Sequence, residues 1–269
     1  MATRSARSDE VRDFSIGRVF ERASAAVMHN PVVTLSAALL LGAIPTLLLT
    51  LLFSEVLGGN GQNASANMSL GLAATGIVTW LAMMAVGVLV QAALTRATVA
   101  ESEGRRAGFG ESMMAGLPVL LPLIGLILLW TIGVALGMML LIVPGIILLL
   151  MWSVAIPAMV EERQGVFAAF ARSRALTSGS RWKILGVLVI LIAAYLLLVG
   201  VLGIAGISSI DISGTATEAE DVSVVAMLGN LISSMLFSLV WGTVQAAIYV
   251  ELRDAKESGN ADSLHEVFA

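Results

Sequence analysis

The sequence predicts an all-α integral membrane protein with six transmembrane helices, on three observations. First, 58% of the 269 residues are hydrophobic and 13% are charged, whereas soluble domains carry about 25% charged residues. Second, the apolar residues form blocks of about 20, the length that a helix needs to cross roughly 30 Å of hydrocarbon. Third, the 15 Lys and Arg residues gather in alternate segments between these blocks. One membrane domain, predicted over residues 14–252, therefore occupies nearly the whole chain.

The amino-terminal region is polar before it becomes amphipathic. Residues 1–13 are predicted to be a disordered cytoplasmic tail, and no short apolar stretch with a cleavage site follows them. From Ser15 to Asn30, apolar residues recur at helical spacing, which predicts an interfacial helix lying on the membrane. Pro31 follows and ends that helix, because the residue before a proline is disfavoured in the α region.

The rest of the chain divides into apolar blocks and short polar connections. The six predicted spans are residues 32–53, 70–94, 118–136, 144–160, 184–207 and 222–250. A tight turn near Gly137 to Gly145 must separate the third span from the fourth. Residues 253–269 are polar and are predicted to be a cytoplasmic tail.

The basic residues predict the orientation of these spans. With six spans, the two termini and the loops 95–116 and 161–183 share one side of the membrane, and they hold all 15 Lys and Arg residues. The three opposite loops hold none. The positive-inside rule therefore places both termini in the cytoplasm, which for a bacterium means the cytoplasmic (inner) membrane.

The spans also show signs of an internal repeat. Amphipathic segments at 15–30, 109–117 and 166–177 precede the three odd-numbered spans, and Val90–Leu94 is similar to Val244–Ile248 near the ends of two even-numbered spans. These matches favour three helical hairpins, each preceded by a cytoplasmic amphipathic segment. Short apolar matches also arise by chance, so an arrangement without repeats stays open.

Several motifs in the second half of the chain and at its two ends form a recognisable set. They are Pro144, Gly145, Ile146, Trp152, Pro157, Glu161, Ala169, Arg172, Ser173, Leu176, Thr177, Gly179, Ile248, Tyr249, Val250, Glu251, Leu252 and Arg253, with Phe14–Gly17 and Leu264–Phe268 at the two ends. Together they resemble a known family, the membrane domain that is attached to some glycerophosphoryl diester phosphodiesterases. The resemblance implies a bacterial membrane protein with six helices and no established activity of its own. It does not imply the phosphodiesterase reaction, which belongs to a separate barrel domain.

The residues themselves do not predict catalysis. The two histidines, His29 and His265, lie at opposite ends of the chain, and there is no cysteine. Serines are numerous, but none has a nearby general base or lies in a Gly-x-Ser-x-Gly motif. We therefore expect a protein that is not an enzyme and that uses no cofactor, metal or nucleic-acid partner.

A few polar residues and prolines interrupt the apolar spans. Gln91 and Gln245 are expected to hydrogen-bond between helices, although they could instead line a cavity. Pro122, Pro144 and Pro157 are expected to be packing kinks, with hinges as the alternative.

The basic segment 166–177 suggests a lipid site. At 100° per residue, Val166, Phe167 and Phe170 face one way, and Arg174 falls between the two phenylalanines. An arginine on an apolar face needs a partner, either a lipid phosphate or a carboxylate of Glu161 or Glu162.

Three further basic residues lie close to Arg174 along the chain. Arg172 faces nearly the opposite way on the same helix, and Arg181 and Lys183 open the next span. The four together predict an anionic headgroup site, and simple anchoring of the topology is the alternative interpretation. The function that the sequence favours is a lipid-associated structural or accessory module in glycerolipid or envelope homeostasis. A transporter or lipid permease is the rival, and a membrane-embedded enzyme is a distant third.

Overall fold

The computed structural model describes residues 14–39, 66–208 and 219–268, apart from 106, 107, 109, 111, 113, 115 and 116. The elements of these residues are all helical, and their bounds are α1 Ile16–His29, α2 Pro31–Ala38, α4 Ala66–Ser102, the 3₁₀ turn η3 Leu117–Val119, α6 Leu120–Leu140, α7 Ile142–Met151, α8 Ala155–Glu162, α9 Val166–Thr177, α10 Arg181–Ser208 and α11 Ala219–Phe268. The predicted all-helical class is therefore confirmed. The predicted tail 1–13, most of the first span and part of the segment 109–117 lie outside the described residues.

Five stretches of the described chain are long and apolar enough to cross a membrane. They are Met83–Ser102, Leu120–Leu140, Ile142–Glu162, Arg181–Val201 and Leu231–Glu257. They overlap the predicted second to sixth spans. The stretch Ile142–Glu162, which overlaps the predicted fourth span, combines α7 and α8, and a short turn separates these two helices.

Two helices continue beyond the ends that the apolar blocks predict. Helix α4 runs to Ser102 instead of ending near residue 94, and α11 continues as helix to Phe268 through the polar segment 253–269. Polar residues end a membrane-spanning block but do not end a helix, and no proline interrupts either extension.

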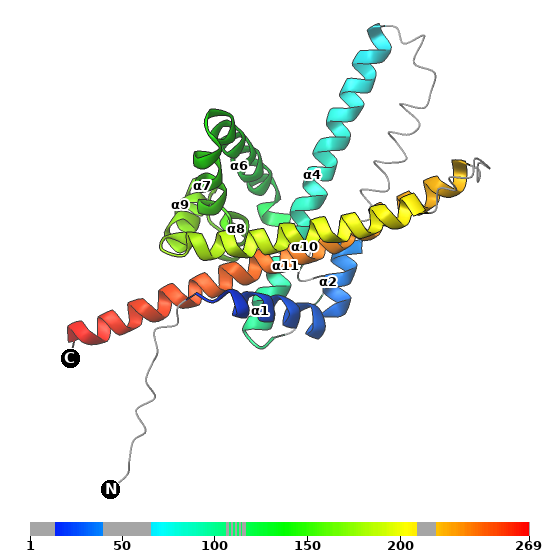
Figure 1. Ribbon diagram of the computed structural model, residues 1–269. Coiled ribbons are helices and arrows are strands. Elements are labelled where there is room, and N and C mark those ends of the chain that lie inside the picture. Colours follow the sequence, from blue (N-terminus) through cyan, green and yellow to red (C-terminus); the bar gives the residue numbers. More distant parts are fainter. Residues whose placement is uncertain are drawn as a thin grey trace.

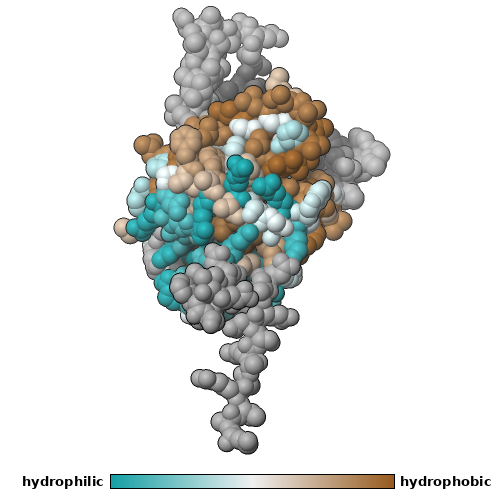
Figure 2. Space-filling view, turned by 90° about the vertical axis from the view of Figure 1, so that its left-hand side faces the viewer, coloured by the Kyte–Doolittle hydropathy of each residue, from teal (hydrophilic) through white to brown (hydrophobic). Residues whose placement is uncertain are grey.

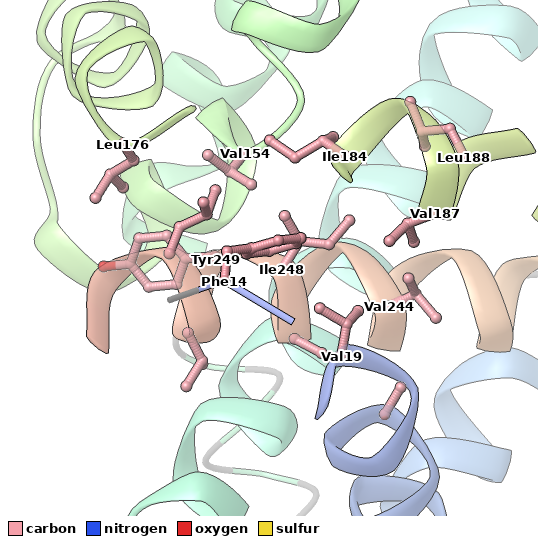
Figure 3. Close-up of a cluster of buried hydrophobic side chains, with 14 of the residues drawn as sticks. Phe14, Val19, Val154, Leu176, Ile184, Val187, Leu188, Val244, Ile248 and Tyr249 are labelled. Carbon is pink, nitrogen blue, oxygen red and sulfur yellow. The ribbon is translucent and has the colours of Figure 1, made fainter. Parts of the chain in front are cut away.

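Helix α11 lies across the middle of the molecule (Figure 1). Helices α1 and α2 lie on one side of it, α6 to α9 lie on the other, and α10 runs beside it (Figure 1). A cluster of buried side chains joins these layers, with Val19 from α1, Ile184 from α10 and Ile248 and Tyr249 from α11 (Figure 3). Helix α11 is therefore the element on which the others pack.

The apolar stripe of α1 packs on protein. Val19, Ala23 and Ala26 are buried, and the helix contacts α11 and α4. The sequence predicted that this stripe would lie on the membrane, and the structure places it against protein instead. Periodicity alone does not tell whether lipid or another helix covers an apolar face. The exposed residues of α1 include Glu21 and Ser24.

Helices α6 and α7 form a close hairpin with its turn at Leu141, inside the predicted window. The Leu141 N–H donates to the Gly137 carbonyl at 3.1 Å, and the Gly145 N–H donates to the Leu141 carbonyl at 3.3 Å. No polar side chain occurs from residue 132 to residue 151. At the tip, Met139 is 86% exposed and Leu140 is 77% exposed, so the turn presents an apolar surface.

Candidate functional site

The fourth predicted span is broken at Trp152–Val154, and Pro157 explains the break. Proline has no N–H, so it cannot donate to the carbonyl four residues earlier, and its ring clashes with that carbonyl. The residue four positions before Pro157 is Ser153, which lies in the turn between α7 and α8. Pro157 itself is buried.

Side chains from two other helices take the place of the lost helical hydrogen bonds. Gln245 of α11 donates from Nε2 to the Ser153 carbonyl at 2.5 Å. Ser173 of α9 donates from Oγ to the Met151 carbonyl at 2.9 Å and accepts from the Val154 N–H at 3.3 Å. A polar group without a partner is costly in apolar surroundings, so these bonds fix α9 and α11 against the break.

The structure brings the two glutamines together across the helices. Gln91 of α4 donates from Nε2 to Oε1 of Gln245. Nearby, α4 crosses α11 at Gly242, where an added Cβ would collide with the side chain of Leu94. The glutamines and the Ser153 carbonyl thus form a chain of hydrogen bonds that joins α4, α11 and the turn between α7 and α8. We call this chain the glutamine relay.

Replacing Gln245 with leucine is expected to lower the free energy of unfolding by about 1–3 kcal/mol, because Gln91 and the Ser153 carbonyl lose their partner. Chemical unfolding in detergent, followed by tryptophan fluorescence, measures this change. Gln91→Leu combined with Gln245→Leu should cost less than the sum of the two single changes. Gln164→Ala is the control, since among the described residues the Gln164 side chain donates only to Glu162, two positions earlier. Equal effects of Gln245→Leu and Gln164→Ala would contradict the relay.

Two acidic residues at the end of α8 hold neighbouring helices. Glu161 pairs with Arg96 of α4, with Oε2 3.0 Å from Nη1. Glu162 accepts from Arg172 Nε at 2.7 Å and from the Tyr249 hydroxyl at 3.0 Å. The hydrogen bond from Arg172 to Glu162 raises the pKa of Arg172, so its guanidinium remains charged at any physiological pH.

A third acidic residue, Glu251 of α11, is almost completely buried. Its side chain is 3% exposed, and Oε1 lies 2.6 Å from Arg18 Nε while Oε2 lies 3.3 Å from Arg22 Nε. Arg22 also pairs with Asp254 at 2.8 Å. These bonds clamp α1 onto α11. The clamp was not predicted from the sequence. The signal that could have suggested it is an acid directly after the apolar run that ends at Val250.

The four predicted headgroup residues divide into two groups. Arg172 is held by Glu162 and also lies 3.6 Å from Glu257, and Lys183 donates to the Phe14 carbonyl at 3.1 Å. Arg174 is exposed and pairs with no residue that the structure describes. Arg181 has a buried Nε that lacks a hydrogen-bond partner among the described residues. Arg174 and Arg181 are thus the two whose guanidinium groups have bonding capacity left for a ligand.

The structure separates the residues of the predicted apolar face of α9. Phe170 is buried, but Phe167 is 79% exposed. The buried face consists of Ala169, Phe170, Ser173, Leu176 and Thr177. Ser173 belongs to this face because its hydroxyl donates to the Met151 carbonyl at the break between α7 and α8. The alternative in which Arg174 pairs with Glu161 or Glu162 is wrong, since Arg96 and Arg172 are the partners of these two acids.

The remaining motif residues shape the backbone or support Tyr249. Pro144 lies in the first turn of α7, and Gly145 packs against Met138. Gly179 has a φ of +87° in the turn after α9, a conformation that favours glycine. The Arg253 guanidinium carbon lies 5.8 Å from the centroid of the Tyr249 ring, within cation–π range.

Hydrophilic and hydrophobic side chains separate on the surface. Figure 2 shows hydrophilic residues gathered beside a broad hydrophobic area on the face that is at the left in Figure 1. Trp182, the second residue of α10, is 85% exposed. No group of three or more His, Asp or Glu residues that could hold a metal occurs within the described part of the chain.

The chain is similar to known membrane proteins. The family described as the membrane domain of glycerophosphoryl diester phosphodiesterase matches residues 123–266, more than half of the chain. A UPF0259 membrane protein of Pectobacterium carotovorum subsp. carotovorum (strain PC1) is 33% identical over 135 residues. The matched part is 50% of this chain and 51% of that relative, so the match spans about half the length of each. No solved structure matches the chain significantly.

Proposed function

Because the chain belongs to the family of the membrane domain of glycerophosphoryl diester phosphodiesterase, we propose that it is a non-catalytic module that holds anionic phospholipid. In this proposal it is a multi-pass protein of the bacterial cytoplasmic (inner) membrane and serves glycerolipid or envelope homeostasis in a structural or accessory role. The family resemblance that the sequence motifs suggested is confirmed by the family match.

The observation that carries the proposal is the chemistry of four residues on α9 and α10, namely Phe167, Arg174, Arg181 and Trp182, which we call the α9–α10 corner. Phe167 and Trp182 are 79% and 85% exposed, and aromatic rings of this kind favour the membrane interface. Arg174 and Arg181 lie on the same two helices and have bonding capacity left. Arginine binds phosphate with charge-assisted hydrogen bonds, so this corner suits an anionic headgroup.

Native mass spectrometry of the purified protein tests the headgroup site. Each basic residue near an anionic membrane contributes about 1 kcal/mol, so the variant Arg174→Gln with Arg181→Gln should retain phosphatidylglycerol about 30-fold more weakly. Arg105→Gln is the control, because Arg105 is exposed, pairs with Glu103 at 2.6 Å and belongs to neither α9 nor α10. Equal retention by both variants, with the fold intact, would reduce the two arginines to orientation signals.

The proposal includes six spans in three hairpins with both termini in the cytoplasm. The positive-inside distribution of the 15 basic residues supports this orientation. Single cysteines at Gly108 and Gly165, which are exposed in two connections, should react with an impermeant maleimide only after the cells are opened. Reaction in intact spheroplasts would reverse the orientation.

A transporter is the second candidate, favoured by the broken helix α7–α8. Discontinuous helices line the substrate sites of many transporters, where water reaches the freed backbone groups. Here Gln245 and Ser173 already occupy those groups, which supports a packed bundle. Cysteines scanned from residue 146 to residue 160 should therefore resist water-soluble reagents in mid-span. A continuous reactive stripe that a small solute protects would favour transport instead.

A further inference from the structure

Two adjoining cavities lie along the groove between α10 and α11. The larger has a volume of about 200 Å³, and Ala194 and Tyr195 of α10 and Phe237 of α11 are among its lining residues. The smaller has a volume of about 40 Å³ and reaches the break between α7 and α8. Leu191 and Trp241 line both cavities, so the two lie side by side, and we call them together the α10–α11 groove.

The lining of this groove suits a hydrocarbon chain. No charged residue lines either cavity. The rings of Tyr195 and Phe237 lie with centroids 4.7 Å apart, and those of Phe237 and Trp241 lie 5.7 Å apart, so three aromatic rings that line the larger cavity pack against one another. A water molecule would find few hydrogen-bond partners in such a space. If the groove were empty, its lining side chains would lack dispersion contacts on the open side.

The surface around the groove is apolar as well. On α10, Val189, Ile192 and Leu197 are 56%, 54% and 72% exposed, and the helix belongs to one of the stretches long enough to cross a membrane. If these side chains face lipid, the groove opens into the hydrocarbon layer. Acyl chains are then the molecules that reach it at the highest concentration.

The same face of α10 leads from the groove to the basic corner. Residues seven apart on an α-helix share a face and are separated by about 10 Å. Arg181, Leu188 and Tyr195 follow this spacing, and Leu188 and Tyr195 line the smaller and the larger cavity. Arg181 therefore belongs to the same face of α10 as these two residues, and its buried Nε lacks a partner in the described chain.

We propose that the α10–α11 groove binds one acyl chain of a phospholipid whose headgroup lies at Arg181 and Arg174. The headgroup part rests on the proposed function, whereas the acyl-chain part rests on the groove alone. Gln245, which lines the smaller cavity and uses one amide hydrogen for the Ser153 carbonyl, has a second amide hydrogen to donate to a polar group of the lipid.

Two neighbouring alanines provide a matched test of the groove. Ala194 lines the larger cavity and Ala193 does not, and both are exposed. Ala194→Trp fills the groove, while Ala193→Trp adds the same side chain to the adjacent lipid-facing surface. Ala194→Leu is a smaller filler whose effect should be intermediate. Far-UV circular dichroism and gel filtration of each variant report whether the fold is retained.

The probes are phosphatidylglycerol and phosphatidylcholine, each with a photoreactive diazirine in one acyl chain, at low content in phosphatidylcholine nanodiscs. Mass spectrometry then locates the cross-links. In the unmodified protein and in Ala193→Trp, cross-links should concentrate on Tyr195, Phe237 and Trp241. In Ala194→Trp these cross-links should be lost for both lipids. Unchanged cross-links in Ala194→Trp, or cross-links spread evenly over the exposed side of α10, would overturn the proposal.

The headgroup variant separates the two proposals. Arg174→Gln with Arg181→Gln should lower groove labelling by phosphatidylglycerol to the level of phosphatidylcholine without moving the labelled residues. If this variant has no effect while Ala194→Trp abolishes labelling, the acyl-chain proposal is supported and the headgroup proposal is contradicted. If only the arginine variant has an effect, the acyl-chain proposal is contradicted.

Discussion

Replacing Arg18 and Arg22 together with methionine should lower the free energy of unfolding by about 3 kcal/mol. Loss of the partners of a buried charge typically costs about 3–5 kcal/mol, and the partial exposure of the two arginines places the value at the low end. The Glu251 carboxylate, with a side chain that is 3% exposed, would remain in place without a counter-charge. Methionine keeps much of the apolar part of the arginine side chain, so the loss of stability is due mainly to the missing positive charges.

The clamp has an internal rescue and a surface control. Adding Glu251→Gln to the double variant should recover part of the stability, because a neutral amide is less costly to bury than a carboxylate. Arg105→Met should cost less than about 1 kcal/mol, since exposed ion pairs contribute little. Chemical unfolding in detergent compares all of these. If the double variant were as stable as Arg105→Met, the clamp would not hold α1 in place.

Replacing Gly145 with alanine should destabilise the α6–α7 hairpin by about 1–3 kcal/mol. An added Cβ would lie 2.5 Å from the Met138 Cγ and 2.7 Å from the Met138 backbone nitrogen. The methionine side chain can move, but the backbone nitrogen can do so only if the helices separate. The gain in helix propensity from alanine, at most about 1 kcal/mol, does not offset this clash.

Gly125→Ala is the matched control on the same hairpin. An added Cβ there would meet its nearest neighbour, Val166 Cγ2, at 4.0 Å, an ordinary contact. This variant should be neutral or slightly stabilised, because alanine favours the helix. Thermal unfolding in detergent distinguishes the two, and equal melting temperatures for both variants would contradict close packing at Gly145.

The sequence predicted the helices better than their partners. The apolar blocks located five stretches that the structure shows to be long enough to cross a membrane, and the amphipathic pattern predicted 166–177, the bounds of α9. Each of these predictions depends on residues within one segment. The Arg18–Glu251 pair joins residues 233 positions apart, and no local pattern indicates that α1 lies against α11.

The residues of α9 that pack on protein could not be predicted for a related reason. The apolar positions Val166, Phe167 and Phe170 do not tell which of them contact protein, and hydrophobicity disregards Ser173. The structure buries Ser173 because the neighbouring helix break exposes a carbonyl and an N–H that this hydroxyl satisfies. The two glutamines could be singled out from the sequence, since an amide within an apolar span has few alternatives to an interhelical hydrogen bond. That Gln245 bonds to the carbonyl freed by Pro157 could be seen only in the folded structure.

The apolar turn between α6 and α7 bears on how the nascent chain enters the membrane. No charged or polar side chain between residues 132 and 151 has to be moved across the hydrocarbon. Moving an elementary charge through 100 mV involves about 2.3 kcal/mol, so the membrane potential does no work on this hairpin. The two helices can then insert together in one step, driven by hydrophobic transfer alone. The segment 208–221, which carries four acidic residues and no basic one, differs, since an inside-negative potential favours its outward transfer.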